Sequence, residues 1–512
     1  MLKNILLALL TVVLCTAAAE GMVRWFDAEA PSDALRHLDE IPLAEGVQRA
    51  WFTENPPPLP NRHAAKTEDF ELIRKVEASG VTEGTRRADM FKAWNSAFVG
   101  PDPCRHPYLK DAPGQIYVYD PVDGERWPRF RFLPNKTTPI GLVTNEYGFR
   151  GPPVPVARQP RTIRIAFIGA STTVSSHNFP YSYPEHIGYW LNRWAAAKKL
   201  DIRFEVLNAG RESIGSNDIA QIMKNEVAPL LPDFVVYYEG ANQFYLKSLV
   251  PDLPPRPAGL PIMARPEPGL LRRALVNLGY TFALARRAES LLARYETPVA
   301  ARSGAIGTPG AGLAATPGAD GREWPKPDYT LVWPQGVDEK DPDLARSDLP
   351  VSLSVILADL DRIGATAQKI DAELAIASYK WLVADGMVLD PVRHRLILEY
   401  LNYGYAPFRY RDLERLASFQ NRVLEKFAKA HHDDFFDVAR LMPSDPDLFV
   451  DAIHGTPEGE RLRAWIVLQF LVPVIDRHLA DGSWPKKSFP PAAPPAPYTP
   501  RVVTFDCQKK AG

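Results

Sequence analysis

The sequence predicts an α/β protein in which helices cover both faces of a mostly parallel β-sheet. Three observations favour this class. From residue 161 onward, short apolar runs typical of buried strands alternate with segments that carry apolar residues at helical spacing. Glycine and polar residues follow the ends of several of these runs. With 512 residues, 46% of them hydrophobic and 24% charged, the chain can also bury a large core.

The first half of the sheet is expected between residues 161 and 240, where strands and helices alternate. An apolar run that starts at Ile165 breaks at Gly169, and Phe234-Val-Val-Tyr-Tyr238 is apolar enough to be buried on both faces. Pro232 is expected to close the helix before that second run. In order, we expect strand 165–168, helix 185–198, strand 204–207, helix 219–231 and strand 234–238.

The same alternation resumes after residue 350 and completes the domain. Thr456 is a good N-cap and Pro457 a good first residue for the last helix, so the loop before it should be firmly anchored. The expected elements are helix 353–370, strand 374–378, helix 410–430, strand 435–438 and a helix from 457 to about 478.

The regions outside this pattern differ from it in composition. Residues 116–119 and 129–132 resemble a small hairpin. A helix is expected at 270–295, and residues 303–350, rich in Gly, Pro and Ala, predict a mobile or extended insertion outside the core. We therefore divide the chain into a signal peptide or N-terminal anchor (1–26), an accessory N-terminal region (27–160), a main domain (161–480, with an insertion at about 250–350) and a Pro-rich tail (481–512) that should run extended.

The N-terminus has the composition of a targeting segment. Lys3 precedes an apolar run from Ile5 to Ala19 that ends in Ala17-Ala18-Ala19, a pattern typical of a cleaved signal peptide. The run is shorter than the roughly 20 residues of a spanning helix, but apolar residues after Gly21 could prolong it into an uncleaved anchor. Both alternatives stay open. Both predict an extracytoplasmic protein that is periplasmic, secreted or attached to the inner membrane.

Net charge and residue content limit the kinds of ligand that the chain is expected to bind. With 60 basic and 61 acidic residues the net charge is −1, so there is no basic field to bind nucleic acid. Cys104 and Cys507 would remain after signal cleavage and could form one disulfide or stay as thiols. His431-His-Asp-Asp434 is better explained as a solvated helix end than as a metal site, because adjacent helical residues cannot all face one ion. No metal or cofactor is therefore expected.

Chemically reactive side chains follow the ends of the first and last predicted strands. Ser171 follows the first strand in Gly169-Ala-Ser-Thr-Thr173, and Asp451-Ala-Ile-His454 follows the last. A serine nucleophile needs a base within reach and a group that orients the base. Because parallel strands deliver such loops to one edge of the sheet, we expect Ser171, His454 and Asp451 to meet there.

Hydrogen-bond donors follow the strands in between. Gly210 and Gly215 come after the second strand, and Asn242 comes after the third. Acyl transfer needs such N–H groups around the oxyanion that develops on the carbonyl. Gly215 is favoured because it lies just before the next helix, and Gly210 stays as its rival.

With these residues in place, the chain resembles the SGNH (GDSL-like) hydrolases of the secreted or membrane-anchored bacterial type, named for blocks that carry Ser, Gly, Asn and His. The order of the blocks, their places at strand ends and the form Asp451-x-x-His-x-Thr-x-x-Gly459 all match, and Asn145-Glu-Tyr-Gly-Phe-Arg-Gly151 resembles the lead-in of many members. The resemblance covers about residues 145–244 and 350–480. It implies a three-layer α/β/α, flavodoxin-like SGNH-hydrolase fold.

The resemblance also implies a role for each candidate residue. Ser171 would be the nucleophile and would donate its own backbone N–H to the oxyanion. The backbone N–H of Gly215 and the side-chain amide of Asn242 would be the other two donors. His454 would act as general base and then as general acid, and Asp451 would orient it.

The chain departs from the family pattern at three points. Ala170 replaces an Asp of the first block, which removes hydrogen bonds that normally fasten the loop. The second block is stretched, which is why Gly210 competes with Gly215. Gln243 replaces the Asp that follows the asparagine of the third block.

These roles predict a serine esterase that hydrolyses or transfers O-acyl groups through an acyl-enzyme, without a cofactor. The alternative is a catalytically inactive protein of the same fold that binds glycans or assists envelope assembly, with Ala170 and Gln243 as signs of drift. Acetyl groups on envelope or extracellular polysaccharide are one hypothesis for the substrate, since aromatic faces suit sugar rings, although the same aromatic residues could equally belong to the core. The aromatic residues concerned are Tyr181, Tyr183, Phe244 and Tyr245. A lipid or thioester substrate stays open as an alternative.

Overall fold

The structure is a computed structural model of the 512-residue chain. It describes residues 2–29, 34–57, 115–120, 143–175, 181–246 except 213, 249–252, 320–390, 394–495 and 499–504, with a few further residues between 59 and 288. The predicted helix at 270–295 and the possible pairing of Cys104 with Cys507 fall largely outside these residues.

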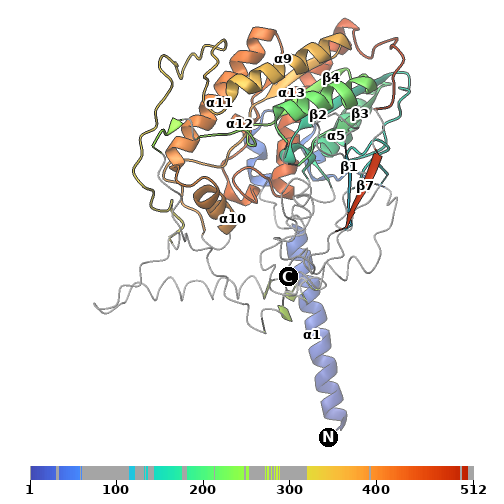
Figure 1. Ribbon diagram of the computed structural model, residues 1–512. Helices are drawn as coiled ribbons and strands as arrows, with labels where there is room; N and C mark the ends of the chain where they lie inside the picture. Colours follow the sequence, from blue (N-terminus) through green and yellow to red (C-terminus); the bar gives the residue numbers. More distant parts are fainter. Residues whose placement is uncertain are drawn as a thin grey trace.

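A five-stranded parallel sheet forms the centre of the molecule (Figure 1). The strand order β3-β2-β4-β5-β6 puts the first strand of the sheet between the second and the third, which is the flavodoxin-like order. The predicted fold class is therefore confirmed. The strands are β2 (Thr162–Gly169), β3 (Arg203–Asn208), β4 (Phe234–Tyr238), β5 (Glu373–Ala377) and β6 (Asp434–Phe436).

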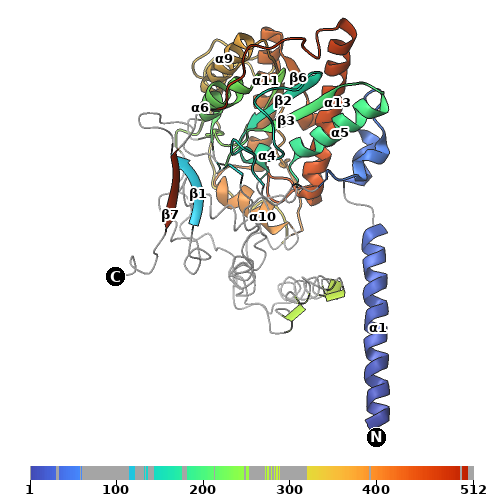
Figure 2. The same ribbon diagram turned by 90° about the vertical axis from the view of Figure 1, so that its right-hand side faces the viewer.

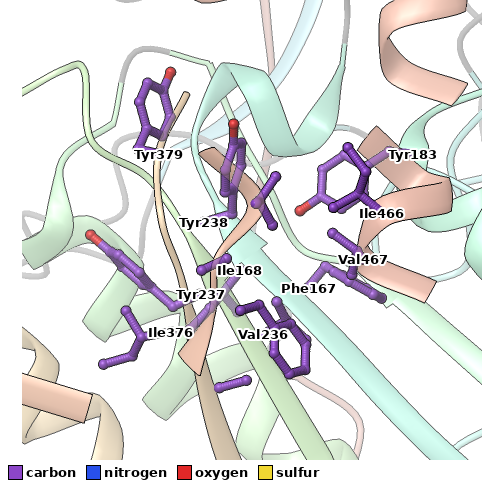
Figure 3. Close-up of a cluster of buried hydrophobic side chains, with 14 of the residues drawn as sticks. Phe167, Ile168, Tyr183, Val236, Tyr237, Tyr238, Ile376, Tyr379, Ile466 and Val467 are labelled. Carbon is purple, nitrogen blue, oxygen red and sulfur yellow. The ribbon is translucent and has the colours of Figure 1, made fainter. Parts of the chain in front are cut away.

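Two groups of helices enclose the sheet. In the first group α5 packs against α13, and in the second α9 packs against both α6 and α11. Figure 3 shows Ile466 and Val467 of α13 beside Phe167 of β2 and Tyr183 of α5, all of them buried. The helices are α5 (Tyr183–Ala197), α6 (Ser216–Ile222), α9 (Leu353–Lys369), α11 (Tyr410–His431) and α13 (Pro457–Asp481).

The predicted helices and strands of the main domain are all present, with small shifts at their ends. The largest difference lies in the helix expected at 219–231, because α6 ends at Ile222. The chain continues as a π-turn, η5 (Met223–Val227), and a 3₁₀-turn, η6 (Ala228–Leu230), before Leu231 takes a left-handed conformation ahead of Pro232. Several short elements lacked a periodic signal, namely α4 (Ser171–Val174), α10 (Arg395–Glu399), η8 (Tyr400–Gly404), α12 (Val438–Leu441) and η9 (Pro446–Leu448).

The start of the accessory region packs into the core of the main domain. It contains two 3₁₀-turns, η1 (Leu35–Glu40) and η2 (Arg49–Thr53). The indole of Trp190 in α5 donates to the carbonyl of Trp51 at 2.9 Å. Phe52 packs edge-on against Trp465 of α13, with ring centroids 5.6 Å apart. This segment therefore extends the layer formed by α5 and α13.

Only the first strand of the hairpin predicted for residues 116–119 and 129–132 can be placed, and the structure does not test its pairing with the second. The first strand exists as β1 (Gln115–Asp120), but its antiparallel partner is β7 (Thr499–Thr504), near the C-terminus. Residues 129–131 lie outside the described residues. The Pro-rich tail therefore contributes a strand at its end, and the local spacing of apolar residues could not reveal a partner so far away in the sequence.

Residues 320–350 form no helix or strand, but they do not lie outside the core as predicted. Trp324 is buried, and its backbone N–H donates to the Asn402 side chain at 3.0 Å. Trp333 packs edge-on against Phe419 of α11, with ring centroids 5.0 Å apart. Aromatic residues without a regular period anchor this segment one by one, so it gave no helical or strand signal. Residues 303–319 lie outside the described residues.

The N-terminal segment, predicted to be a signal peptide or anchor, is helical over its whole described length. Helix α1 (Leu2–Glu29) projects from the rest of the molecule in Figure 2. None of the described helices has the length and apolar character that crossing a membrane requires.

Candidate active site

Ser171 opens the four-residue helix α4 directly after β2. Apolar residues bury the whole of β2, which ends at Gly169, and Ala170 is the N-cap of the turn. The Thr173 hydroxyl donates to the carbonyl of Tyr238 at the end of β4, at 3.1 Å. The turn is thereby fastened to the neighbouring strand, with Ser171 almost fully buried at the carboxyl end of the sheet.

The loop that carries Asp451 and His454 is fixed at both ends. The Val450 N–H donates to the His454 carbonyl at 2.8 Å. As predicted, Thr456 is the N-cap of α13, and its hydroxyl accepts from the Gly459 N–H at 3.2 Å. The long helix α13 therefore holds the loop rigidly in place.

The structure brings Ser171, His454 and Asp451 together. His454 Nε2 lies 2.9 Å from Ser171 Oγ, although the two residues are 283 positions apart. His454 Nδ1 lies 2.8 Å from one carboxylate oxygen of Asp451. Since that carboxylate can only accept, it favours the tautomer with hydrogen on Nδ1, which leaves Nε2 free to accept the serine proton. The arrangement matches the geometry of a nucleophile, base and orienting acid.

The N–H groups predicted to stabilise the oxyanion differ in whether they already donate to another group of the protein. One N–H of the Asn242 amide donates to the Ile214 carbonyl at 2.8 Å, and the amide has a second N–H. The single N–H of Gly215 donates to the Asp218 carboxylate at 3.1 Å. That of Gly210 donates to the Asn208 side chain at 3.1 Å. Both glycine donors are thus engaged, and either would have to exchange its partner to bind an oxyanion.

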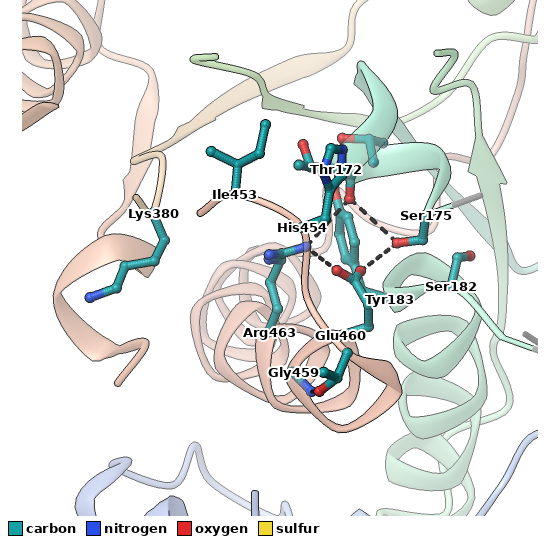
Figure 4. Close-up of polar contacts among 12 residues, drawn as sticks. Thr172, Ser175, Ser182, Tyr183, Lys380, Ile453, His454, Gly459, Glu460 and Arg463 are labelled. Carbon is teal, nitrogen blue, oxygen red and sulfur yellow. Dashed lines mark hydrogen bonds and ion pairs between the residues drawn. The ribbon is translucent and has the colours of Figure 1, made fainter. Parts of the chain in front are cut away.

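Side chains from distant segments bind the carbonyl groups of the Ser171 turn. A helix of four residues cannot satisfy its own last carbonyls. The Thr173 carbonyl accepts from Asn208 at 2.9 Å, and the Val174 carbonyl accepts from the buried guanidinium of Arg150 at 3.0 Å. Arg463 of α13 donates to the Thr172 carbonyl at 3.4 Å (Figure 4). These contacts fasten a turn in which Ala170 stands where the family has an Asp.

Sequence reasoning missed the roles of the two arginines. Arg150 is part of segment 145–151, which resembles the lead-in of SGNH hydrolases, so its position was a usable signal. Arg463 lies close to Glu460 and Arg461 in the charged first turns of α13, and nothing in its local pattern distinguishes it from a solvent-exposed helical arginine.

Glu239 is a buried carboxyl group next to the proposed oxyanion donor. It follows β4, and one of its oxygens accepts the backbone N–H groups of Ala241 and Asn242, each at 2.8 Å. Burial raises the pKa of Glu239 to about 7, although these N–H groups and the nearby His454 act to lower it. Its carboxyl group therefore fixes the backbone of Asn242.

The aromatic residues considered for sugar binding divide into core and surface positions. Tyr183 and Phe244 are buried, the latter against Trp381 with ring centroids 4.7 Å apart, so these two belong to the core. The Tyr181 hydroxyl donates to the Pro56 carbonyl at 2.7 Å. Tyr245 is 62% exposed.

In the part of the chain that the structure describes, no three His, Cys, Asp or Glu residues are grouped so as to hold a metal ion. His431 of the cluster at 431–434 lies 3.4 Å from the Asp361 carboxylate.

Comparison with solved structures places the chain near GDSL-like lipases and acetyl xylan esterases. No protein-family model matches the sequence, and no curated protein matches it. A GDSL-like lipase from Bacteroides thetaiotaomicron is similar with 12% identity, over 62% of this chain and 88% of the other, at a TM-score of 0.25. An acetylxylan esterase from Geobacillus stearothermophilus is similar with 13% identity, over 60% of this chain and 94% of the other, at a TM-score of 0.31. A lipase/acylhydrolase from Enterococcus faecalis is similar with 13% identity, over 61% of this chain and 96% of the other, at a TM-score of 0.28. At such identities the likeness concerns the fold alone.

Proposed function

We propose that the protein is a serine esterase of the SGNH type, which hydrolyses or transfers O-acyl ester groups. The observation that carries the proposal is the 2.9 Å separation of Ser171 Oγ and His454 Nε2, with Asp451 on the other ring nitrogen. Nucleophile, base and orienting carboxylate are the parts that acyl transfer requires. All three are buried at the edge of the sheet where parallel α/β proteins place their chemistry.

In the proposed reaction, Ser171 Oγ attacks the ester carbonyl carbon while its proton passes to His454 Nε2. The negative charge on the carbonyl oxygen is stabilised by the Ser171 backbone N–H and the second N–H of Asn242. When the intermediate collapses, the alcohol leaves with the proton from His454, and the acyl group stays on Ser171. Water or an acceptor hydroxyl, deprotonated by His454, then releases the acyl group.

For the substrate, we propose acetyl or other O-acyl groups on polysaccharide of the cell envelope or outside the cell. The apolar N-terminal run supports an extracytoplasmic location. Tyr245, three residues after Asn242, offers an exposed aromatic face of the kind that packs on sugar rings. Release of acetate from acetylated xylan by the wild type, and none by Ser171→Ala, would support this substrate class; hydrolysis of small esters alone would contradict it.

The esterase assignment is tested by replacing the nucleophile. Ser171→Ala should lower kcat for p-nitrophenyl acetate by roughly 10⁴-fold or more, because the remaining residues cannot form the acyl-enzyme. Ser354→Ala is the matched control, since Ser354 lies in α9 and bonds only to residues 346 and 349 among the contacts described. Activity that survives in Ser171→Ala, or a folded wild type with no activity on esters, would favour the inactive binding protein instead.

A further inference from the structure

One buried carboxylate touches both halves of the proposed site. The Ser175 hydroxyl, at the end of the Ser171 turn, donates to the Glu460 carboxylate in the first turns of α13 (Figure 4). The other Glu460 oxygen lies against Gly455, the residue after His454, so closely that a Cβ there would be 2.8 Å from it. Glu460 therefore lies between the nucleophile turn and the histidine loop.

Arg463 compensates the charge of Glu460 inside the protein. The two side chains form an ion pair, and they are 0% and 2% exposed. Burial by itself lowers the pKa of Arg463, but Glu460, Tyr238 and other tyrosines outweigh it and raise the pKa above its ordinary value. The guanidinium also lies 5.2 Å from the Tyr238 ring centroid. A buried ion pair of this kind contributes little net stability to a fold, so stability alone does not account for its presence.

Ser175 connects Glu460 to the turn that carries the nucleophile Ser171. It is in the left-handed region with φ of +50°, which is unfavourable for a residue other than glycine. Its backbone N–H donates to the Ser171 carbonyl at 2.8 Å, and its own carbonyl accepts from Arg150. The hydroxyl contact with Glu460 helps to hold this conformation, and a shift of Ser175 would move Ser171.

We propose that Glu460, paired with Arg463, is a positioning residue that sets the separation of Ser171 Oγ and His454 Nε2. It acts through Ser175 on one side and through the loop at Gly455 on the other, and it touches no reacting atom. The inference rests on the proposed esterase function. Displacing a reacting group by about 1 Å can cost roughly 10²-fold in rate, so a residue in this place has a large effect on turnover.

The test compares Glu460→Gln with Glu205→Gln in the full-length chain. Glu205 forms an equally buried pair with Arg164 between β2 and β3, with side chains 4% and 0% exposed. Glu460→Gln should lower kcat for p-nitrophenyl acetate, and the rate of Ser171 labelling by a fluorophosphonate, by roughly 10²-fold with KM nearly unchanged. Glu205→Gln should lower the melting temperature by a similar amount but leave kcat per folded molecule as in the wild type.

Ser175→Ala removes only the hydroxyl and keeps the test decisive where Glu460→Gln does not fold; we expect roughly a tenfold loss of kcat. Wild-type kcat in the folded Glu460→Gln or in Ser175→Ala overturns the inference. Equal losses in Glu460→Gln and Glu205→Gln also overturn it, because they would reflect general loosening. A wild type that is neither active nor labelled has a different signature: the esterase proposal itself fails, and this inference falls with it.

Discussion

Asp451 divides its carboxylate between His454 and its own loop. One oxygen lies 2.8 Å from the imidazole, and the other accepts the backbone N–H groups of Ile453 and His454, each at 2.9 Å. The same side chain thus shapes the loop and orients the base. The resemblance to SGNH hydrolases implied the contact between Asp451 and His454, whereas the contacts with the loop backbone were not predicted. The contact with Ser171 depends on the whole fold, and the Asp-x-x-His spacing alone could not give it.

Glu239 shows what local sequence cannot reveal about a single residue. Its carboxyl group binds the backbone of the turn that carries Asn242, and the surrounding protein buries it fully. In the sequence it is one acidic residue after an apolar strand, where a solvated carboxylate would be unremarkable. Its burial depends on segments far away in the chain, so neither its raised pKa nor its contact with Asn242 could be predicted.

Burial of Glu239 should make stability fall with rising pH. Its pKa is raised from 4.5 to about 7, so between these values the folded protein keeps a proton that the unfolded chain releases, and rising pH favours unfolding. In Glu239→Gln this carboxyl group is absent, so its contribution to the fall of stability with rising pH is lost. Its free energy of unfolding, relative to wild type, should rise by about 3 kcal/mol from pH 4.5 to pH 7.

Urea denaturation at a series of pH values measures this difference. Glu45→Gln, which removes a carboxylate that is 86% exposed, should give a difference that hardly changes with pH. If the free energy of unfolding of Glu239→Gln relative to wild type changed as little with pH as that of the control, burial would not raise the pKa of Glu239.

At the scale of elements, helix α4 is held by its surroundings more than by its own hydrogen bonds. The apolar run that ends at Gly169 predicted both β2 and the position of Ser171 after it. The groups that bind the turn, Asn208, Arg150 and Arg463, come from three separate segments, and local sequence patterns do not show that the three meet. These contacts explain how Ser171 is held in place although Ala170, the residue before it, has no side chain that can form a hydrogen bond.

Gly210 should be essential because it packs directly on this turn. A Cβ on Gly210 would overlap the backbone nitrogen of Val174 and lie 2.9 Å from the Thr173 Cβ, so the turn would have to shift. We expect Gly210→Ala to lower kcat/KM for p-nitrophenyl acetate by roughly 10²-fold through displacement of Ser171. Steady-state kinetics of the purified, folded variant measures the loss.

Gly364→Ala in α9 is the matched control, since its Cβ would be 3.9 Å from the nearest atom, in Leu374. It should keep full activity and gain up to about 1 kcal/mol in stability, as alanine is the better helix former. Unchanged activity in Gly210→Ala would mean that the turn has room that the structure does not show.

The strands differ in how well the sequence predicts them. The strand β4 is apolar on both faces, and it matches its predicted bounds of 234–238. The strand β1 was also found, but its pairing with β7 was not predicted, because that pairing joins segments far apart in the sequence. Apolar runs identify buried strands, whereas the pairing of a peripheral strand depends on where its partner comes to lie.

On the scale of the whole molecule, the fold class followed from the alternation of strands and helices, and the packing of the irregular segments did not. The strand order β3-β2-β4-β5-β6 puts the loops after β2 and β4 at one edge with the histidine loop. Residues 34–57 and 320–350 join the core through scattered side chains such as Ile41, Trp51 and Trp324, which leave no periodic signal. Segments of this kind can be placed only in three dimensions.

The central claim is that folding gathers Ser171 and His454 into one nucleophilic site, and fluorophosphonate labelling followed by peptide mass spectrometry tests it most directly. We predict a single adduct on the peptide that contains Ser171, formed at least about 10³-fold more slowly in His454→Ala, because the hydroxyl needs the imidazole as its base. An adduct on a different residue, or a labelling rate that is the same in His454→Ala and the wild type, would contradict it.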